Sequence, residues 1–157
     1  MAHIIRAGAG EVLGPPTGCQ DRFVVDSRET DGRLALVEHI LAPHSIAAPM
    51  HRHSREDEMS VILEGRVWFV AAGEEHVAEV GDVVVKPRGE WHTFWNAADS
   101  PARLMELIHP GGLEHGFRTM DTSEDDDVLA QVAIDYGCDL DLDATGPIME
   151  RYGLVFA

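Results

Sequence analysis

The sequence predicts an all-β domain, a sandwich or barrel, followed by a short helical tail. From residue 21 to about 109, short runs rich in Val, Ile, Leu, Phe and Trp are separated by Gly, Pro or charged residues every eight to twelve positions. That spacing is typical of short strands joined by turns. After Pro110 the apolar period becomes that of a helix. We therefore place a β domain at residues 1–112 and an acidic helical extension at 113–157.

The β domain is expected to contain eight strands. In chain order they are residues 21–27, 33–41, 58–65, 66–72, 76–80, 82–87, 91–96 and 102–109. Each run is rich in β-branched or aromatic residues, which suit a pleated and half-buried surface. A hairpin turn is expected at Gly65, because glycine adopts a positive φ without a Cβ clash. Gly73 and Gly81 end the next two runs in the same way.

The tail is expected to begin with a helix from about 124 to 136. The apolar stripe that predicts it consists of Val128, Leu129, Val132, Ala133 and Tyr136. Ser123 is the expected N-cap, and the acids at 124–127 would then lie in the first turn, near the positive end of the helix dipole. Gly137 stands where a left-handed residue ends a helix. A second short helix is expected at 147–152.

Composition excludes several classes of partner. The formal net charge is −16, with one lysine among the 12 basic residues, so the surface repels phosphate backbones and anionic lipid. We expect neither a nucleic-acid nor a membrane partner. Since no apolar run approaches the roughly 20 residues of a spanning helix and the first residues lack a secretory pattern, we expect a soluble, cytoplasmic protein. Cys19 and Cys138 form no metal or redox motif and are expected to be free thiols.

His51 and His53 lie two residues apart, so on a strand both side chains point to the same face. Two converging imidazoles suit a divalent metal ion. The step from His53 to Glu58 is odd, which requires a bend between them and puts Glu58 at the start of the next strand. Glu56 and Asp57 are expected to be solvated residues of that bend.

A third imidazole comes from His92 in the run 91–96. Three neutral imidazoles and one carboxylate around a dication leave a net charge of about +1 and, if the ion is six-coordinate, two open positions. A structural zinc site would more often close four ligands and use thiolates. The sequence therefore predicts a reactive centre for Fe(II), Mn(II), Ni(II) or Zn(II), with the ligands His51, His53, Glu58 and His92.

Two spaced motifs resemble those of the cupin superfamily. The first, HxH, four residues, E, six residues, G, is filled by His51, His53, Glu58 and Gly65. The second, G, five residues, PxG, two residues, H, three residues, N, is filled by Gly81, Pro87, Gly89, His92 and Asn96. The glycine that usually stands before the first histidine is replaced by the segment 45–47. The resemblance covers about residues 20–110 and implies a double-stranded β-helix, or jelly-roll barrel, with the four ligands in its mouth.

In length and in the segment 53–58, the chain resembles small single-domain cupins grouped with quercetin dioxygenases. That resemblance implies a metal-dependent dioxygenase acting on an enol or hydroxy-carbonyl small molecule, with Glu58 as the catalytic residue that accepts a substrate proton. Two alternatives remain open. One is a non-oxidative isomerase or cyclase, and the other is a module that binds a small molecule without chemistry.

The substrate pocket is expected beside the ligands. Its candidate residues share a face with a ligand or end a strand near the site, and they are Phe94, Ser60, Ile62 and His109. Barrel edges and the apolar stripe of the 124–136 helix also predict a homodimer.

Overall fold

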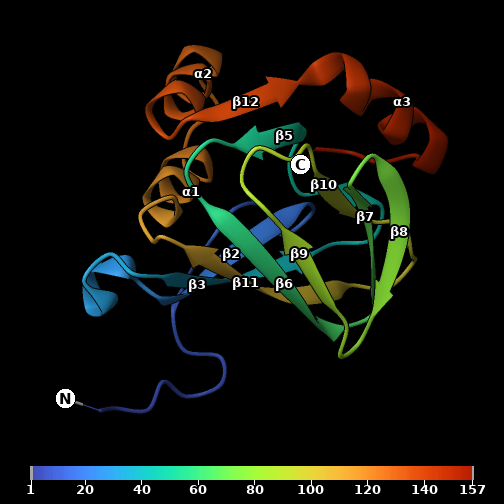
Figure 1. Ribbon diagram of the computed structural model, residues 1–157. Helices are drawn as coiled ribbons and strands as arrows, with labels where there is room; N and C mark the ends of the chain where they lie inside the picture. The colour runs from blue at the N-terminus through green and yellow to red at the C-terminus, as the bar shows by residue number, and fades with distance from the viewer. Residues whose placement is uncertain (1, 157) are drawn as a thin grey trace.

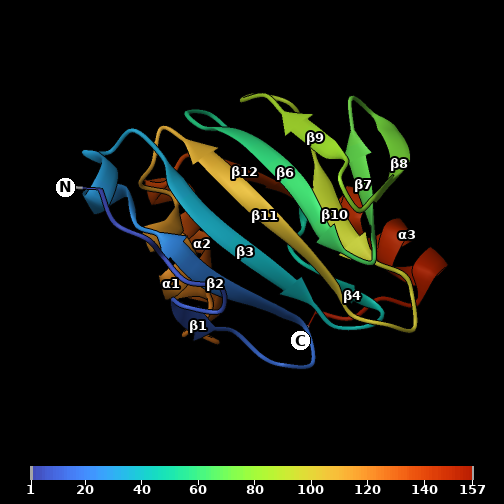
Figure 2. The same ribbon diagram turned by 90° about the horizontal axis from the view of Figure 1, so that it is seen from below.

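A computed structural model describes residues 2–156 and shows two main antiparallel sheets that form a jelly-roll barrel (Figures 1 and 2). The first sheet has the order β1 (Glu11–Leu13), β2 (Cys19–Val25), β3 (Ala35–Leu41), β11 (Ala102–His109), β6 (Asp57–Glu64) and β9 (Val83–Lys86). The second has the order β4 (Ser45–Ile46), β10 (Thr93–Asn96), β7 (Arg66–Ala71) and β8 (Glu74–Glu79). A third sheet pairs β12 (Cys138–Asp141) with β5 (Met50–His53). This architecture confirms the predicted fold class.

All the predicted strands are present, and no end differs from its predicted position by more than two residues. The strand β5 lies outside the eight predicted runs, although the spacing of His51 and His53 was interpreted on a strand, and the strands β1, β4 and β12 were not predicted. They contain only two to four residues, which is too short for an alternating pattern to show, and their conformation depends on the strand that they pair with. Gly65 has φ 72° and joins β6 to β7, which confirms the hairpin turn.

The barrel interior is filled from both sheets. Ile62 and Leu104 are register partners on neighbouring strands of the first sheet. Phe69 and Phe94 are register partners on neighbouring strands of the second sheet, and their ring centroids are 5.6 Å apart. All four are at most 4% exposed. Burying such a side chain stabilises the fold by about 1.5–3 kcal/mol, so this cluster fixes how the two sheets pack and where β10 lies.

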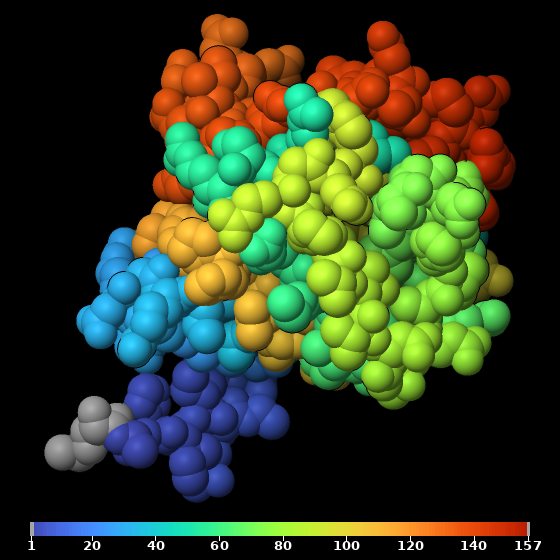
Figure 3. All heavy atoms as spheres, viewed as in Figure 1, coloured from blue at the N-terminus to red at the C-terminus, as the bar shows by residue number. Residues whose placement is uncertain are grey.

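Three tail helices lie against one end of the barrel (Figures 1 and 3): α1 (Glu114–Met120), α2 (Asp126–Asp135) and α3 (Leu142–Tyr152). The helix α1 was not predicted, because it is short, has no side-chain N-cap and contains Gly116. The tertiary structure explains this glycine, since a Cβ there would lie 2.9 Å from the ring of Tyr136. Within residues 2–156, none of the helices is long and apolar enough to cross a membrane.

The other two tail helices differ from the prediction at their starts. Asp125, not Ser123, is the N-cap of α2, because its Oδ1 accepts from the backbone N–H groups of Asp127 and Val128. The left-handed Gly137 (φ 67°) follows α2, as predicted. The helix α3 begins at residue 142, not 147. Proline usually marks the start of a helix, but here Pro147 lies inside it and Asp141 provides the cap.

Candidate metal centre

The strand that carries two of the predicted ligands is held by the C-terminal tail. In the small sheet, Leu140 of β12 is the register partner of His51, and Cys138 is the partner of His53. On its other side, His51 exchanges backbone hydrogen bonds of 2.9 and 2.8 Å with His92. The two sequence motifs are therefore joined directly, backbone to backbone, at the histidines themselves.

Glu58 completes a cluster of four buried side chains. Its Oε2 lies 3.2 Å from His92 Nε2, and its Oε1 lies 3.5 Å from His53 Nε2. Each of the four offers one ligand atom, and these atoms all lie within 4.8 Å of one another. The residues His51, His53, Glu58 and His92 are each at most 7% exposed. Bonds of about 2.1 Å to one ion would require only a small contraction of this set.

The imidazoles are oriented with free lone pairs. His51 Nδ1 donates to the carbonyl of Pro49 at 2.7 Å, and His92 Nδ1 donates to the carbonyl of Glu90 at 3.0 Å, which leaves each Nε2 as an acceptor. Among the described residues, His92 Nε2 and both ring nitrogens of His53 have no hydrogen-bond partner. A buried ring nitrogen that has no hydrogen-bond partner can be satisfied by a bond to a metal ion.

The pKa shifts of His51 and His53 also favour neutral imidazoles. Burial, followed by the nearby imidazoles of His92 and His53, lowers the pKa of His51 well below its usual range. Burial also lowers the pKa of His53. Burial alone would raise the pKa of Glu58, but Lys86 and the histidines together hold that pKa well below its usual range. Neutral imidazoles and an ionised carboxylate form a donor set that fits a divalent ion.

Sequence reasoning missed two charged residues behind this cluster, Lys86 and Glu106. Lys86 Nζ lies 3.1 Å from Glu58 Oε2 and donates to Glu106 Oε2 at 2.6 Å, and all three side chains are buried. Two signals were available: the chain's only lysine ends an apolar strand, and Glu106 alternates with Leu104 and Ile108 on the inward face of β11.

A cavity of about 1140 Å³ opens beside the cluster. Phe94, the first pocket candidate, lines it together with His51, His53 and Glu58. The other candidates lie elsewhere. Ile62 is in the barrel core, Ser60 Oγ donates to Glu106 at 2.8 Å, and the exposed His109 Nδ1 donates to the carbonyl of Arg33 at 2.7 Å. Much of the remaining lining comes from the tail, including Phe117, Val132 and Tyr136.

The tail also covers the bend before Glu58. Glu56 was predicted to be solvated, but it is only 6% exposed. The reason is that Ser54 N donates to the carbonyl of Gly137 and Arg55 donates to that of Asp135, so the end of α2 packs on the bend. Asp57 accepts two hydrogen bonds from the Arg88 guanidinium and points away from the cluster.

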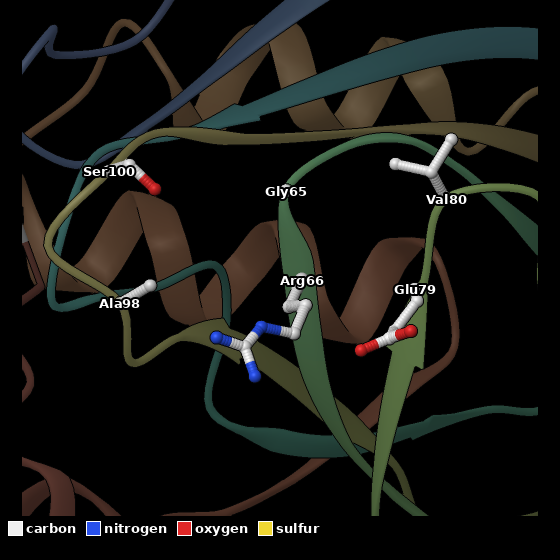
Figure 4. A pocket seen from close by; sticks show the side chains of 6 residues that line it. All are labelled: Gly65, Arg66, Glu79, Val80, Ala98 and Ser100. Carbon is white, nitrogen blue, oxygen red and sulfur yellow. The ribbon is translucent and has the colours of Figure 1, made fainter.

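A second, smaller pocket of about 460 Å³ lies at the turn between β6 and β7 (Figure 4). Its lining consists of Gly65, Arg66, Glu79, Val80, Ala98 and Ser100, none of which lines the larger cavity. Arg66 and Glu79 are cross-strand partners of β7 and β8. Among these six lining residues there is no histidine or cysteine, so we place the functional site at the larger cavity.

Comparison with known proteins agrees with the barrel. A family model described as a cupin domain matches residues 37–109, which include all four candidate ligands. No curated protein matches the chain. The segment 110–157, which supplies β12 and the tail helices, lies outside the matched residues.

Several solved structures share the fold. KdgF from Halomonas sp. has a TM-score of 0.62 and 18% identity, over 72% of this chain and 99% of that chain. A predicted oxalate decarboxylase from Thermotoga maritima has a TM-score of 0.61 and 20% identity, over 69% and 99%. The polyketide cyclase RemF from Streptomyces resistomycificus has a TM-score of 0.59 and 22% identity, over 69% and 80%. At these identities the likeness concerns the fold.

Proposed function

We propose that this chain is a metal-dependent enzyme whose substrate is a small molecule with enol or hydroxy-carbonyl oxygens, and that its reaction is a dioxygenation, because residues 37–109 match a model described as a cupin domain. The observation that supports this proposal is the convergence of three imidazoles and one carboxylate at the wall of a large cavity. These four ligands would leave two positions of a six-coordinate ion free for a substrate, whereas a closed four-coordinate structural site would leave none.

A bound divalent ion supplies Lewis acidity toward a substrate oxygen and, if it is redox-active, electrons for chemistry with dioxygen. The protein supplies the base. Glu58 is ionised, and its Oε2 is already in contact with Lys86 and His92, so a proton taken from the substrate hydroxyl would be held at Oε1. Because the pKa of Glu58 is low, it accepts a proton only from a hydroxyl that is itself strongly acidified.

The cavity provides the rest of the environment. Phe94, whose ring centroid lies 5.0 Å from Lys86 Nζ, and apolar residues of the tail form apolar walls beside Glu58, and such walls strengthen electrostatic interactions. Apolar walls also favour a substrate with a largely apolar body.

A non-oxidative isomerisation or cyclisation is the second candidate, and the pair of carboxylates around Lys86 favours it. Lys86 holds the pKa of Glu58 low, whereas burial raises the pKa of Glu106. Of two carboxyl groups whose pKa values differ in this way, the one with the low pKa can accept a proton and the one with the raised pKa can donate one, as acid–base catalysis requires. Such a reaction would not consume oxygen.

One experiment separates these functions. The metal content of the purified protein is measured by elemental analysis, and a panel of enols and flavonols is then incubated with it in air and under nitrogen. Oxygen uptake that matches substrate loss, and no loss under nitrogen, supports the dioxygenase. Equal turnover without oxygen supports the isomerase or cyclase. Binding without turnover supports a binding module, and wild-type protein that takes up no metal would overturn the proposal.

A further inference from the structure

A second group of buried polar side chains lines the same cavity, away from the four candidate ligands. Cys19 and Asp21 of β2 and His39 of β3 belong to it, and all three are among the cavity-lining residues. His39 Nδ1 donates to Asp21 Oδ1 at 2.6 Å, and Cys19 Sγ lies 3.7 Å from the same carboxylate oxygen. Asp21 and His39 are each only 6% exposed.

This group is not built as a nucleophile with its base. Cys19 Sγ and Asp21 Oδ1 both approach His39 Nδ1, whereas a catalytic triad needs the thiol and the carboxylate on different ring nitrogens. Burial raises the pKa of the Cys19 thiol well above its usual range, so it is not a thiolate. Although burial opposes it, Asp21 raises the pKa of His39, and the two form an ion pair without net charge.

Asp121, which follows α1, adds an acceptor to this group. It lines the cavity, and its Oδ2 is buried without a hydrogen-bond partner among residues 2–156. Burial and then the neighbouring Asp21 raise the pKa of Asp121 to about 7. A buried acceptor that no protein group satisfies is a place where a ligand donor gains a hydrogen bond without displacing one.

Phe94 lies between the two polar ends of the cavity. Its ring centroid is 5.0 Å from Lys86 Nζ, which contacts Glu58, and 5.2 Å from the ring of His39. In the first sheet, β6 and β3 are separated by β11 alone, which corresponds to two strand spacings, or about 10 Å. A ligand body of one or two rings would cover that span over Phe94.

From this geometry we infer that the cavity recognises a two-ended ligand: an apolar, ring-containing molecule that presents oxygen atoms to the ligand cluster and a hydrogen-bond donor to Asp121, which stands beside the Asp21–His39 pair. This inference rests on the proposed function for the first end only. Asp121, Asp21 and His39 are then the residues that determine specificity at the second end. Above the pKa of Asp121, which is about 7, a hydroxyl or ammonium group satisfies them and a carboxylate is repelled.

The charge of the tail supports the same selectivity. Lining residues of the cavity include Glu124 and Asp126 besides Asp121, and the whole chain carries a net charge of −16. A cavity with carboxylates along one side concentrates neutral and cationic ligands and disfavours anions.

The test uses the full chain loaded with zinc, which is redox-inert and prevents oxidative turnover. The probes are 3,4-dihydroxybiphenyl, whose catechol chelates a metal ion, and its 4′-hydroxy, 4′-aminomethyl and 4′-carboxylate derivatives. Dissociation constants are measured by calorimetry. We expect the 4′-hydroxy and 4′-aminomethyl probes to bind about 10-fold more tightly than the unsubstituted probe, and the carboxylate to bind more weakly.

Variants identify the residue responsible. Asp121→Ala should remove both preferences, whereas Asp121→Asn keeps an acceptor and should retain only the preference for hydroxyl. Asp127→Ala removes an exposed acid of the same tail and should change nothing. Catechol alone should bind all four proteins equally, and their zinc content should be the same, because none of these residues belongs to the ligand cluster.

The outcomes separate the two proposals. If the four probes bind with equal affinity, or if Asp121→Ala keeps the preference, the second recognition end is wrong while the metal centre stands. If removal of zinc with a chelator leaves the affinity of every probe unchanged and the 4′ preference persists, the second end stands and the metal anchor is wrong. If no biphenyl probe binds protein that holds zinc and binds catechol, the inference is overturned, because the cavity then does not accept a two-ended ligand.

Discussion

Lys86 Nζ lies 3.1 Å from Glu58 Oε2, so a buried ammonium group is in direct contact with the only carboxylate of the candidate metal centre. The same ammonium group donates to Glu106 at 2.6 Å. One cation therefore compensates two buried carboxylates, which could not both be ionised so close together without it. The contact also fixes the carboxylate plane of Glu58 and ties the geometry of the site to the stability of the barrel.

Replacement of Lys86 is expected to destabilise the barrel. Lys86→Met leaves Glu58 and Glu106 buried without a counter-charge, and breaking a buried ion pair typically costs about 3–5 kcal/mol. The double variant Lys86→Met/Glu106→Gln should recover part of that loss. Urea denaturation of the metal-free proteins measures the difference. A single variant within about 0.5 kcal/mol of wild type would contradict the role assigned to Lys86.

Metal binding is expected to depend on the histidines of both motifs. Loss of a residue that hydrogen-bonds a metal ligand typically weakens metal binding roughly 10–100-fold. His51→Ala and His92→Ala each remove a ligand itself, so each should weaken the binding of a divalent ion by more than that. The exposed His76, on β8, provides the matched control, and His76→Ala should leave the metal content unchanged. Elemental analysis after dialysis gives the result. Equal metal content in all three variants would place the ion elsewhere.

One side-chain hydrogen bond from the tail is expected to stabilise β5, in addition to its pairing with β12. Met50 N, next to His51, donates to the buried Thr145 Oγ1 of α3 at 2.9 Å. Thr145→Val preserves the shape but leaves that N–H group unsatisfied, so the free energy of unfolding should fall by about 1–3 kcal/mol. Thr119→Val, at an exposed position of α1, should have little effect. If both variants unfold at the same urea concentration, the tail does not support β5 in this way.

Stability is expected to depend on pH through Asp121. Its pKa rises from 3.8 in the unfolded chain to about 7 in the folded protein, so between these values the folded state binds the extra proton. Stability from this group must therefore fall as pH rises from about 4 to 7. Asp121→Asn removes that slope, and its stability relative to wild type should improve over the same range.

A second group adds to this slope in both proteins. The raised pKa of His39 contributes stability that is present below pH 6.5 and is lost as pH rises through its folded-state pKa. Urea denaturation at pH 4, 5, 6, 7 and 8 measures both proteins. Parallel pH profiles of wild type and Asp121→Asn would show that the Asp121 carboxyl is not buried as described.

The homodimer predicted from the sequence is tested by light scattering. A mass of twice the 17.2 kDa of one chain would support it, and a mass of one chain at working concentration would contradict it.

Local chemistry explains why much of this protein could be predicted from its sequence. Alternating apolar residues and a glycine with positive φ define each strand and the turn at Gly65, and they need no distant partner to do so. The spacing of His51 and His53 determines that both face one side. Such signals predicted a sandwich or barrel, its strands along the chain and the four candidate ligands, while the resemblance to cupins implied the jelly-roll barrel with these side chains in its mouth, where the structure brings them together.

The tertiary structure alone decided what surrounds those four side chains. Lys86 and Glu106 are in contact because β9 and β11 both pair with β6. The apolar period within each strand does not predict which strands pair. Likewise β12 forms because β5 offers it an edge, and Gly116 fits because Tyr136 packs on it from another helix. The sequence by itself determined the donor atoms and the barrel that holds them, since these depend on short-range pattern. The buried ion pair, the tail and the second polar end of the cavity depend on contacts between residues far apart in the chain, which only the folded structure specifies.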